Sequence, residues 1–418
     1  MKSEENKDPE FVYRAQLVKL KPTKEQEVLL EKCVGTSRFV FNKTLHNAIK
    51  TYEKNGKSMD FMAFKRALTS VKEEKFPWMY ELPKTVVQHA INNVQTAYKN
   101  FFRRVKQGGA PGFPKFKKKG RSRDSARIDN GPGSFSFTSE GILCRQKDGL
   151  FKIFGDGPRW PEAKQMSCTV SREPSGWYAS VMFKIPLESV LKRNPNPNKA
   201  VGIDLGVAQP LSLYSKTGWT QFYGKKVSED LKKKEVKLAR YQRMLARRTL
   251  GGKNWNKTKV KIQRLHETMR NVRKDFQEKT SNRIAKGYEL ISFEDLSLRN
   301  MTKQVRKNED GTPRKSVAAK SGLNRSLLRM GLSRLVARTE QKSHDWGHLM
   351  VKVNPRYTSQ TCSECGVIDS ESRKNQAKFK CVHCNFAWNA DLNAAKNILA
   401  RGEVAKKELG LKAKLLAA

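Results

Sequence analysis

The stretch "AVGIDLGVAQPLSLYSKTGWTQFY" (200–223) decides the fold of the C-terminal half of the chain. Its apolar runs predict a strand that ends at Asp204, a second strand, a turn at Lys216–Gly218 and a third strand. Gly206 lets the chain turn after the first strand with little bulk. The pattern therefore places a carboxylate at the end of a buried core strand.

Two further acids occupy comparable positions. Glu294 in "ISFEDL" follows another apolar strand, and Asp391 in "NADLNAA" lies at or near a helix N-terminus. Taken singly, each fits an ordinary role, Asp391 as a helix N-cap and Glu294 as a strand-end acid. Taken together with Asp204, they form a carboxylate set at the ends of core elements. Crowded carboxylates repel one another unless cations occupy the site.

Magnesium ions are the natural cations for such a carboxylate set. Mg²⁺ takes oxygen ligands, keeps water and accepts phosphate oxygens. Two Mg²⁺ ions about 3.5–4 Å apart can activate water and stabilise the leaving 3′ oxygen of a phosphodiester. Three strands with an acid on the first, an acid after a later strand and an acid on a final helix are the arrangement of a ribonuclease H-like nuclease. A Gly-rich phosphate loop with a lysine and a Ser/His/Asp set are both missing, which excludes NTPase and serine-hydrolase interpretations.

Two cysteine pairs lie between the second and the third acid. Cys362 and Cys365 form one Cys-x2-Cys pair, Cys381 and Cys384 form the other, and fifteen residues separate the pairs. Four thiolates at this spacing are typical of a closed structural zinc ribbon, which leaves no position for a catalytic water. His383 lies inside the second pair, but four cysteines already complete the tetrahedron. We therefore predict one structural Zn²⁺ held by the four cysteines.

The composition points to a polyanionic partner. The chain of 418 residues carries 84 Lys and Arg against 40 Asp and Glu, a formal net charge of +44. Attraction to phosphate grows with each neutralised charge, so tight and salt-dependent binding of nucleic acid is expected. Charge alone leaves a merely cationic or ribosomal-type protein open as the alternative.

The sequence also predicts the compartment. It has no apolar run long enough to span a membrane, and its N-terminus lacks the apolar core of a signal peptide. Cys33, Cys144 and Cys168 lie apart from one another in apolar contexts, which suits a reducing compartment. We expect a soluble, intracellular protein with no membrane partner.

The N-terminal half begins with a strand pattern and continues with helices. Thr23 and Gln26 form a capping box at the start of the first helix. An amphipathic pattern over 84–106 predicts a second clear helix, on whose polar face Lys84 and Gln88 lie one turn apart. Such a pair suits contact with phosphate and base edges, and an ordinary solvated face is the alternative.

A loop and a set of short strands follow. The segment "KQGGAPGFPKFKKKGRSR" (106–123) combines glycine, proline and many cations, which predicts a boundary loop against nucleic acid or a simple linker. Short strands over 133–187, including a hairpin around 174–176, favour a small β-barrel. The N-terminal strand pattern over 10–22 is expected to join this barrel.

The C-terminal half returns to helices after the three strands. Two long basic helices flank "GGKNWNK" (251–257), which predicts an antiparallel helical hairpin. A strand over 288–301, a helix over 322–343 and a strand over 349–355 follow.

The quoted motifs resemble those of a known family. "GIDLG", "FEDLSLRNM", "VNPRYTSQTCSECG" and "NADLNAAKNI" are similar to the RuvC and zinc-ribbon signatures of TnpB, the RNA-guided nuclease of bacterial insertion sequences and a relative of type V CRISPR effectors. "TSRFVFNKTL" (36–45) and 96–119 resemble its N-terminal half. The resemblance covers nearly the whole chain, and it implies that Asp204, Glu294 and Asp391 bind two catalytic Mg²⁺ ions. The chain departs from the family in "GVAQPLSLYS", where a proline interrupts the second strand.

The resemblance also implies an architecture of α/β and β-barrel parts. A ribonuclease H-like (RuvC) nuclease domain would carry an inserted zinc ribbon, and a β-barrel wedge domain would enclose a helical recognition domain. The expected boundaries are 1–20 and 113–198 for the wedge, 21–112 for recognition, 199–355 and 386–403 for RuvC, 356–385 for the zinc ribbon and 404–418 for a dispensable tail.

The leading hypothesis is a Mg²⁺-dependent, RNA-guided DNA endonuclease, and the resemblance implies a bacterial, cytoplasmic protein that is associated with the nucleoid. Guide RNA would come from the transposon end, and its pairing with double-stranded DNA would select the target beside a short flanking motif. A compact type V-like CRISPR effector of the same ancestry is the first alternative. A guided DNA-binding repressor that does not cut is the second, and a transposase is the third.

Overall fold

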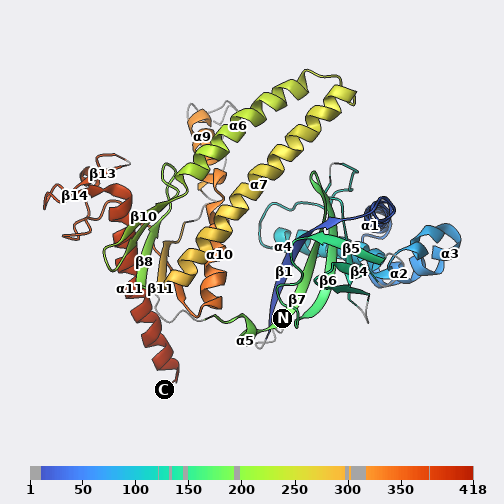
Figure 1. Cartoon of the computed structure of the whole chain (residues 1–418), viewed down its shortest axis with the longest axis horizontal. Helices are drawn as coiled ribbons and strands as arrows, with labels where there is room; N and C mark the ends of the chain where they lie inside the picture. The colour runs from blue at the N-terminus through green and yellow to red at the C-terminus, as the bar shows by residue number, and fades with distance from the viewer. Residues whose placement is uncertain are drawn as a thin grey trace. The chain divides into compact units, whose positions relative to one another are not determined.

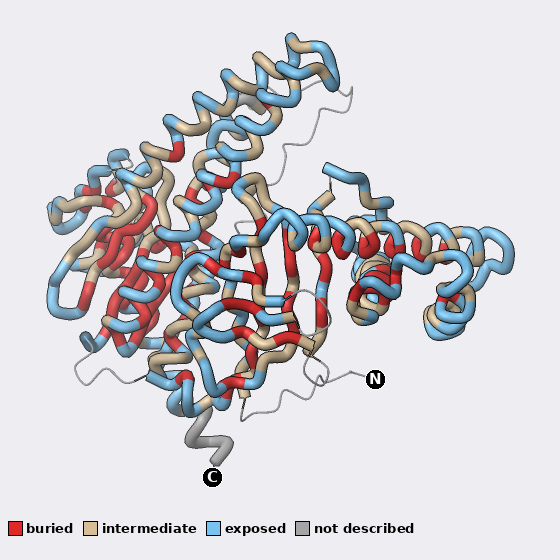
Figure 2. The backbone as a smooth tube through the Cα atoms, turned by 45° about the vertical axis from the view of Figure 1, so that its right-hand side comes forward, coloured by how far each residue is buried: buried red, intermediate tan, exposed pale blue. Residues whose placement is uncertain are grey.

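The protein forms two compact units, Met1–Val190 and Leu191–Ala418 (Figure 1). The structure, a computed structural model, describes residues 11–417 apart from 121, 131–133, 145–148, 193–197, 297–300, 303–316 and 376. Buried residues gather in the strands of each unit and on the helix faces that cover them (Figure 2). Among the helices of these described residues, none is long and apolar enough to cross a membrane.

The first unit is built around a seven-stranded sheet with the order β2-β6-β7-β1-β5-β4-β3. The N-terminal strand β1 pairs antiparallel with both β7 and β5, as predicted. The predicted hairpin is also confirmed, because Glu173 pairs with Gly176 across a turn of Pro174 and Ser175. The strands are β1 (Phe11–Lys21), β2 (Ser125–Asp129), β3 (Phe135–Phe137), β4 (Ile142–Cys144), β5 (Gly149–Phe154), β6 (Lys164–Glu173) and β7 (Gly176–Pro186).

The predicted barrel is an open, curled sheet in the described residues, because its edge strands β2 and β3 do not pair with each other. A side chain replaces part of the missing ladder. The Gln165 amide on β6 donates to the Phe137 carbonyl of β3 at 2.8 Å, and its Oε1 accepts from the Phe137 N–H at 2.8 Å. These two hydrogen bonds satisfy backbone groups that would otherwise lack a partner inside the fold.

The helices of this unit follow the predicted boundaries closely. Helix α1 (Lys24–Asn55) begins with the predicted capping box of Thr23 and Gln26, and α4 (Lys84–Lys106) spans the predicted range. Shorter helices complete the unit: α2 (Phe61–Ser70), α3 (Lys72–Lys75), the 3-10 helix η1 (Pro77–Glu81) and α5 (Leu187–Val190).

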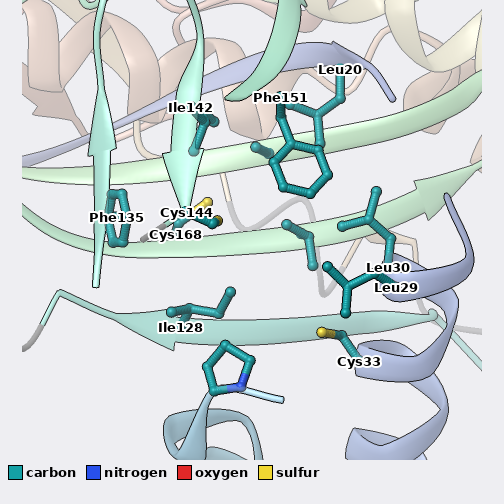
Figure 3. A pocket seen from close by; sticks show the side chains of 13 residues that line it. Leu20, Leu29, Leu30, Cys33, Ile128, Phe135, Ile142, Cys144, Phe151 and Cys168 are labelled. Carbon is teal, nitrogen blue, oxygen red and sulfur yellow. The ribbon is translucent and has the colours of Figure 1, made fainter. Parts of the chain in front are cut away.

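The three scattered cysteines line one apolar cavity of about 30 Å³ between α1 and the sheet (Figure 3). Cys33 comes from α1, Cys144 from β4 and Cys168 from β6. Burial raises the pKa of the Cys168 thiol far above its ordinary value. A thiol that stays protonated is a poor nucleophile and metal ligand, so Cys168 acts here as a small apolar side chain.

The cationic loop after α4 is fixed to the helices of the first unit. The Asn42 side chain donates to the Lys117 carbonyl at 2.9 Å and accepts from the Lys117 N–H at 2.8 Å. The Lys117 ammonium lies 4.3 Å from the ring centre of Phe41, and Phe113 packs edge-on against Phe101. Around Phe113 and Lys117 the loop therefore packs on this unit and is not a simple linker, and its contact with nucleic acid stays a prediction.

The second unit contains a five-stranded mixed sheet with the order β10-β9-β8-β11-β12. The first three strands are antiparallel neighbours, whereas β8, β11 and β12 run parallel. This confirms the three strands predicted over 200–223, but Pro210 precedes β9 instead of interrupting it. The strands are β8 (Asn198–Asp204), β9 (Leu211–Ser215), β10 (Thr220–Tyr223), β11 (Tyr288–Glu294) and β12 (Leu349–Val353).

Helices cover both faces of this sheet. Side chains of α6 (Lys225–Ala246), α7 (Lys253–Gly287) and α10 (Leu332–Asp345) share one apolar cluster with Val201, Ile203 and Leu213. On the other face, Ile398 and Leu399 of α11 (Ala390–Ala417) pack with Ala200. The predicted helical hairpin is confirmed by α6 and α7, although α7 already begins inside "GGKNWNK".

The helix predicted over 322–343 is interrupted. It forms α9 (Val317–Arg329) and α10, with Gly331 between them at a φ of 61°. The buried Gln277 amide of α7 donates to the carbonyls of Met330 and Gly331 at 2.8 and 3.0 Å. These bonds satisfy carbonyls at the end of α9, so a distant side chain stabilises the break. At the C-terminus, α11 continues without a break through most of the predicted tail.

Two candidate metal sites

The first two acids of the predicted carboxylate set end adjacent parallel strands. Asp204 is the last residue of β8 and Glu294 is the last residue of β11, and the preceding residues Ile203 and Phe293 pair directly. Because parallel strands end at the same edge of a sheet, both carboxylates lie at that edge. Asp391 lies in the first turn of α11, which packs on β8.

Two glycines allow α11 to lie close to the sheet. A Cβ atom at Gly202 of β8 would lie 2.1 Å from the Ala395 carbonyl oxygen of α11. A Cβ atom at Gly402 of α11 would lie 1.8 Å from Ser292 Oγ of β11. Neither distance is sterically possible. The close approach of α11, and with it the position of Asp391, therefore depends on residues without side chains.

Asp391 is not the N-cap of α11. The Asn389 side chain accepts hydrogen bonds from the backbone N–H groups of Asp391 and Leu392 at 3.0 and 3.1 Å. This is the bonding pattern of an N-cap residue. Asn389 caps the helix, so the alternative role of Asp391 as an ordinary N-cap is wrong. The Asp391 carboxylate is available for other contacts.

The pKa of Asp204 responds to the charges of the other two acids. Burial, followed by the charges of Glu294 and Asp391, raises the pKa of Asp204 to about 7. Burial also raises the pKa of Glu294 and of Asp391. Ionised acids in this position are unfavourable without a counter-charge, and divalent cations with oxygen ligands supply it. The donor set fits Mg²⁺.

Neighbouring groups that the motifs did not single out also act on the acids. The Thr358 hydroxyl donates to Glu294 Oε1, and Arg373 Nη2 lies 4.0 Å from Asp391 Oδ1. The Arg373 charge lowers the pKa of all three acids against the effect of burial. In the sequence Arg373 was one cation among many, and only the folded chain distinguishes it.

The second site is the predicted cluster of four cysteines. The ligand atoms of Cys362, Cys365, Cys381 and Cys384 all lie within 4.8 Å of one another. Among the described residues, no other group of three or more His, Cys, Asp or Glu side chains is this tight, and the three carboxylates are spread more widely. The backbone N–H groups of Cys384 and His383 donate to Cys381 Sγ and lower the pKa of that thiol to about 6. Four thiols in this geometry fit a zinc site.

Other contacts hold the cysteine loops in place. His383 is not drawn into the cluster, because its Nε2 pairs with Asp369 at 3.1 Å. Strands β13 (Lys378–Lys380) and β14 (Ala387–Asn389) form a small antiparallel sheet beside the cysteines. Two buried amides of α11 tie the first cysteine loop to the helix, since Asn393 and Asn397 both donate to the Thr361 carbonyl. The cysteine loops and the helix that carries Asp391 are thus one connected structure.

Replacing Cys381 by serine is expected to abolish stoichiometric zinc binding. A structural zinc ion contributes roughly 10–16 kcal/mol to the folding of small zinc modules, and loss of one thiolate opens the tetrahedron. Metal analysis of the purified protein should find one zinc per chain in the parent and less than a tenth of that in the variant. Cys144→Ala, in the cavity of the first unit, is the control and should keep its zinc. Full zinc content in Cys381→Ser would refute the ligand assignment.

The two residues suggested for nucleic-acid contact lie in the first unit. Lys84 is the exposed first residue of α4, and Gln88 is half-buried one turn later. Both belong to a different unit from the carboxylates. Their role therefore stays a prediction.

Three family models match separate parts of the chain. One described as "Probable transposase" matches residues 168–305, one described as "Cas12f1-like, TNB domain" matches 333–398, and one described as "Helix-turn-helix domain" matches 12–57. In this chain the last range forms strand β1 and the single long helix α1.

Relatives match over most of the chain. A putative RNA-guided DNA endonuclease InsQ of Escherichia coli (strain K12) is 32% identical over 390 residues, which cover 92% of this chain and 90% of the relative. A putative RNA-guided DNA endonuclease of Streptomyces pristinaespiralis is 26% identical, covering 94% of this chain and 90% of the relative. The CRISPR-associated endodeoxyribonuclease Cas12f1 of Sulfoacidibacillus thermotolerans is 29% identical, but the match covers only 53% of this chain and 49% of the relative. By its identity and coverage, this chain belongs to the TnpB family, the OrfB family of IS605-type elements.

Proposed function

We propose that this protein is an RNA-guided DNA endonuclease whose cutting centre is formed by Asp204, Glu294 and Asp391. The observation that carries the proposal is the placement of three carboxyl groups at the ends of β8 and β11 and at the start of α11, where Glu294 and Asp391 raise the pKa of Asp204. The relatives that match over nine-tenths of their length are named as RNA-guided DNA endonucleases, which supports the same function. The net charge of +44 suits binding to two nucleic acids at once.

The strand order supports a ribonuclease H-like (RuvC) nuclease fold for the second unit. Three antiparallel strands are followed by two parallel ones, and the acids lie on the first strand, on the fourth and on the final helix. Bound Mg²⁺ would supply an activated water and charge stabilisation of the leaving oxygen. The carboxylates would hold the ions, Thr358 would orient Glu294, and Arg373 would balance negative charge that accumulates at the site.

The proposed domains follow the same reasoning. The curled sheet of β1–β7 would serve as the wedge, the helices over 21–112 as the recognition domain, and the cysteine loops over 356–385 as a zinc ribbon inserted before the last nuclease helix. Guide RNA from the transposon end and double-stranded DNA with a short flanking motif are the proposed partners.

The proposal is tested by the RNA that copurifies with the chain. Sequencing this RNA identifies the guide segment and its genomic source, which also separates a transposon-end RNA from a CRISPR RNA. DNA matched to the guide should then be cut with Mg²⁺ and remain intact without divalent cations. Guide-directed binding with no cutting would favour the repressor, and strand-transfer products would favour a transposase.

Replacing Arg373 by glutamine is expected to shift the acidic limb of the cleavage pH profile to higher pH. A positive charge lowers the pKa of neighbouring acids, and Arg373 has this effect on all three. Without it the carboxyl groups release their protons at higher pH, so the ionised form that binds metal appears later on the pH scale. Initial cleavage rates between about pH 5 and 9 measure the shift. Arg270→Gln, an exposed arginine of α7, is the control, and an equal profile for Arg373→Gln and the parent would contradict the placement of Arg373.

A further inference from the structure

A second cavity lies in the C-terminal unit, between the edge strand β10 and the C-terminal end of α7. Its volume is about 230 Å³, and Trp219, Gln221, Tyr223, Arg283 and Tyr288 contribute to its lining. Alternate residues of a strand point to the same face, so Trp219, Gln221 and Tyr223 form one row along the hairpin. No motif of the sequence drew attention to this cavity.

The cavity is separate from the carboxylate site. Gln221 pairs with Leu213, which pairs with Ile203, and these residues share the face of the sheet that packs on α7. Asp204 is the next residue of β8 and therefore points to the opposite face. The cavity also lies toward the opposite end of the parallel strands, because Tyr288 is the first residue of β11 whereas Glu294 is the last.

The cavity wall combines flat surfaces with an oriented amide. The Arg283 guanidinium lies 5.6 Å from the ring centre of Tyr223, and its Nη1 donates to the Tyr223 hydroxyl at 3.3 Å. That hydroxyl donates in turn to Gln221 Oε1, which directs the amide nitrogen of Gln221 away from this bond. Within the part of the chain that the structure describes, that nitrogen has no hydrogen-bond partner, and Arg283 has no acidic partner.

The occupant suggested by this chemistry is flat, polar at its edge and part of an anion. The cavity is far larger than the roughly 30 Å³ of one water molecule and smaller than the pockets of about 300–1,000 Å³ that hold drug-sized ligands. The Trp219 side chain is 46% exposed at its mouth, where an indole can stack on an incoming ring. Unstacked bases are bound by aromatic rings, by guanidinium planes and by amides that contact the base edge.

We propose that this cavity binds one unstacked nucleobase of a single-stranded nucleic acid. The ring would stack at Trp219 and at the paired Tyr223 and Arg283 surface, and the Gln221 amide would contact its edge. The proposal does not depend on nuclease activity. A result that contradicts base binding in this cavity would not contradict the proposed nuclease function, and the reverse also holds.

Photocross-linking tests the proposal on the full-length chain. The protein is freed of nucleic acid in high salt, kept without divalent cations and mixed with single-stranded RNA or DNA that carries 5-iodouracil. The salt concentration is set to weaken phosphate contacts, and tryptic peptides are mapped by mass spectrometry. The peptide 217–225 contains Trp219, Gln221 and Tyr223 and is expected to carry the cross-link.

Matched variants separate this cavity from the rest of the cationic surface. Binding of the oligonucleotide should weaken about 5- to 150-fold in Trp219→Ala, the range for loss of one base-stacking contact. Phe222→Ala is the control, since Phe222 is equally exposed at 45% but points to the other face of β10. Arg283→Lys keeps the charge and loses the planar guanidinium, so it should also bind more weakly. Thermal melting of each variant verifies that it is folded.

The outcomes decide both the site and the source of the base. A cross-link with RNA alone, with DNA alone or with both identifies the strand that supplies the base. The proposal is overturned if peptide 217–225 carries no cross-link in either arm while other peptides do. It is equally overturned if an oligonucleotide with an abasic site at the labelled position competes as well as an intact one, because phosphate would then account for the binding.

Discussion

Replacing Asp204 by asparagine is expected to abolish DNA cleavage while guide-directed DNA binding persists. Among the three acids, Asp204 is the one whose pKa responds to both of the others, Glu294 and Asp391. Loss of one ligand removes several kcal/mol of transition-state stabilisation, which corresponds to about a thousandfold in rate or more. Cleavage rates and binding of matched DNA, measured on the same preparation, separate the two effects. Cutting at the parental rate would rule out Asp204 as a metal ligand.

The same substitution should stabilise the metal-free protein at alkaline pH. The pKa of Asp204 is about 7 in the folded chain against an ordinary 3.8, so the folded state holds a proton that the unfolded state has released between these values. Stability is therefore lost as pH rises from about 4 to about 7, by up to about 4 kcal/mol at about 1.36 kcal/mol per pKa unit. Asparagine does not titrate, so the variant escapes this loss.

Urea unfolding without divalent cations measures this difference. Asp204→Asn and the parent should differ little near pH 4 and most above pH 7, with the variant more stable. Asp275→Asn is the control, because Asp275 is 61% exposed beside Lys279 and should change stability little at any pH. A gap between variant and parent that does not widen with pH would contradict the buried, mutually repelling arrangement.

Replacing Gly202 by alanine is expected to reduce both stability and cleavage strongly. The new Cβ would lie 2.1 Å from the Ala395 carbonyl oxygen and 2.6 Å from the Leu399 backbone nitrogen, and backbone atoms cannot rotate away. Helix α11 must therefore move off β8. Overpacking of this kind costs roughly 1–3 kcal/mol or more, and a misplacement of about 1 Å at a catalytic group lowers the rate about a hundredfold.

Thermal unfolding and cleavage of Gly202→Ala are compared with Gly322→Ala. Gly322 lies in α9 of the same unit and is exposed, and among the described residues a methyl group there would meet nothing beyond its own stretch of helix within 4 Å. Its replacement should leave cleavage unchanged and stabilise the helix by up to about 1 kcal/mol. If Gly202→Ala has the melting temperature and the cleavage rate of the parent, the position of α11 does not depend on this glycine.

Local sequence patterns were sufficient to predict many of the structural elements. The apolar runs of 200–223 indicated three strands in the right order, and Thr23 with Gln26 marked the start of α1. The cysteine spacing indicated the four-thiol cluster. These features depend on neighbours in the sequence, because strand alternation, helix capping and Cys-x2-Cys loops act over a few residues.

Other features had no local signal. The break at Gly331 depends on Gln277, 54 residues away. At the edge of the curled sheet, the Gln165 side chain forms hydrogen bonds with the backbone of β3. A periodic helix pattern and a set of short strands gave no indication of either side chain. The capping role of Asn389 was not predicted either, because Asn389 and Asp391 both lie near the start of α11 and both are residue types that cap helices; only the hydrogen bonds of the folded chain distinguish them.

The sequence by itself determined which residues are candidates for the chemistry: three acids at the ends of core elements and four cysteines at zinc-ribbon spacing. The tertiary structure decided how close the acids come and what acts on them. Gly202 and Gly402 let α11 approach the sheet, and Arg373 reaches Asp391 from the cysteine loops. Such contacts join residues far apart in the chain, and their distances follow from how the elements pack rather than from the preference of any single segment.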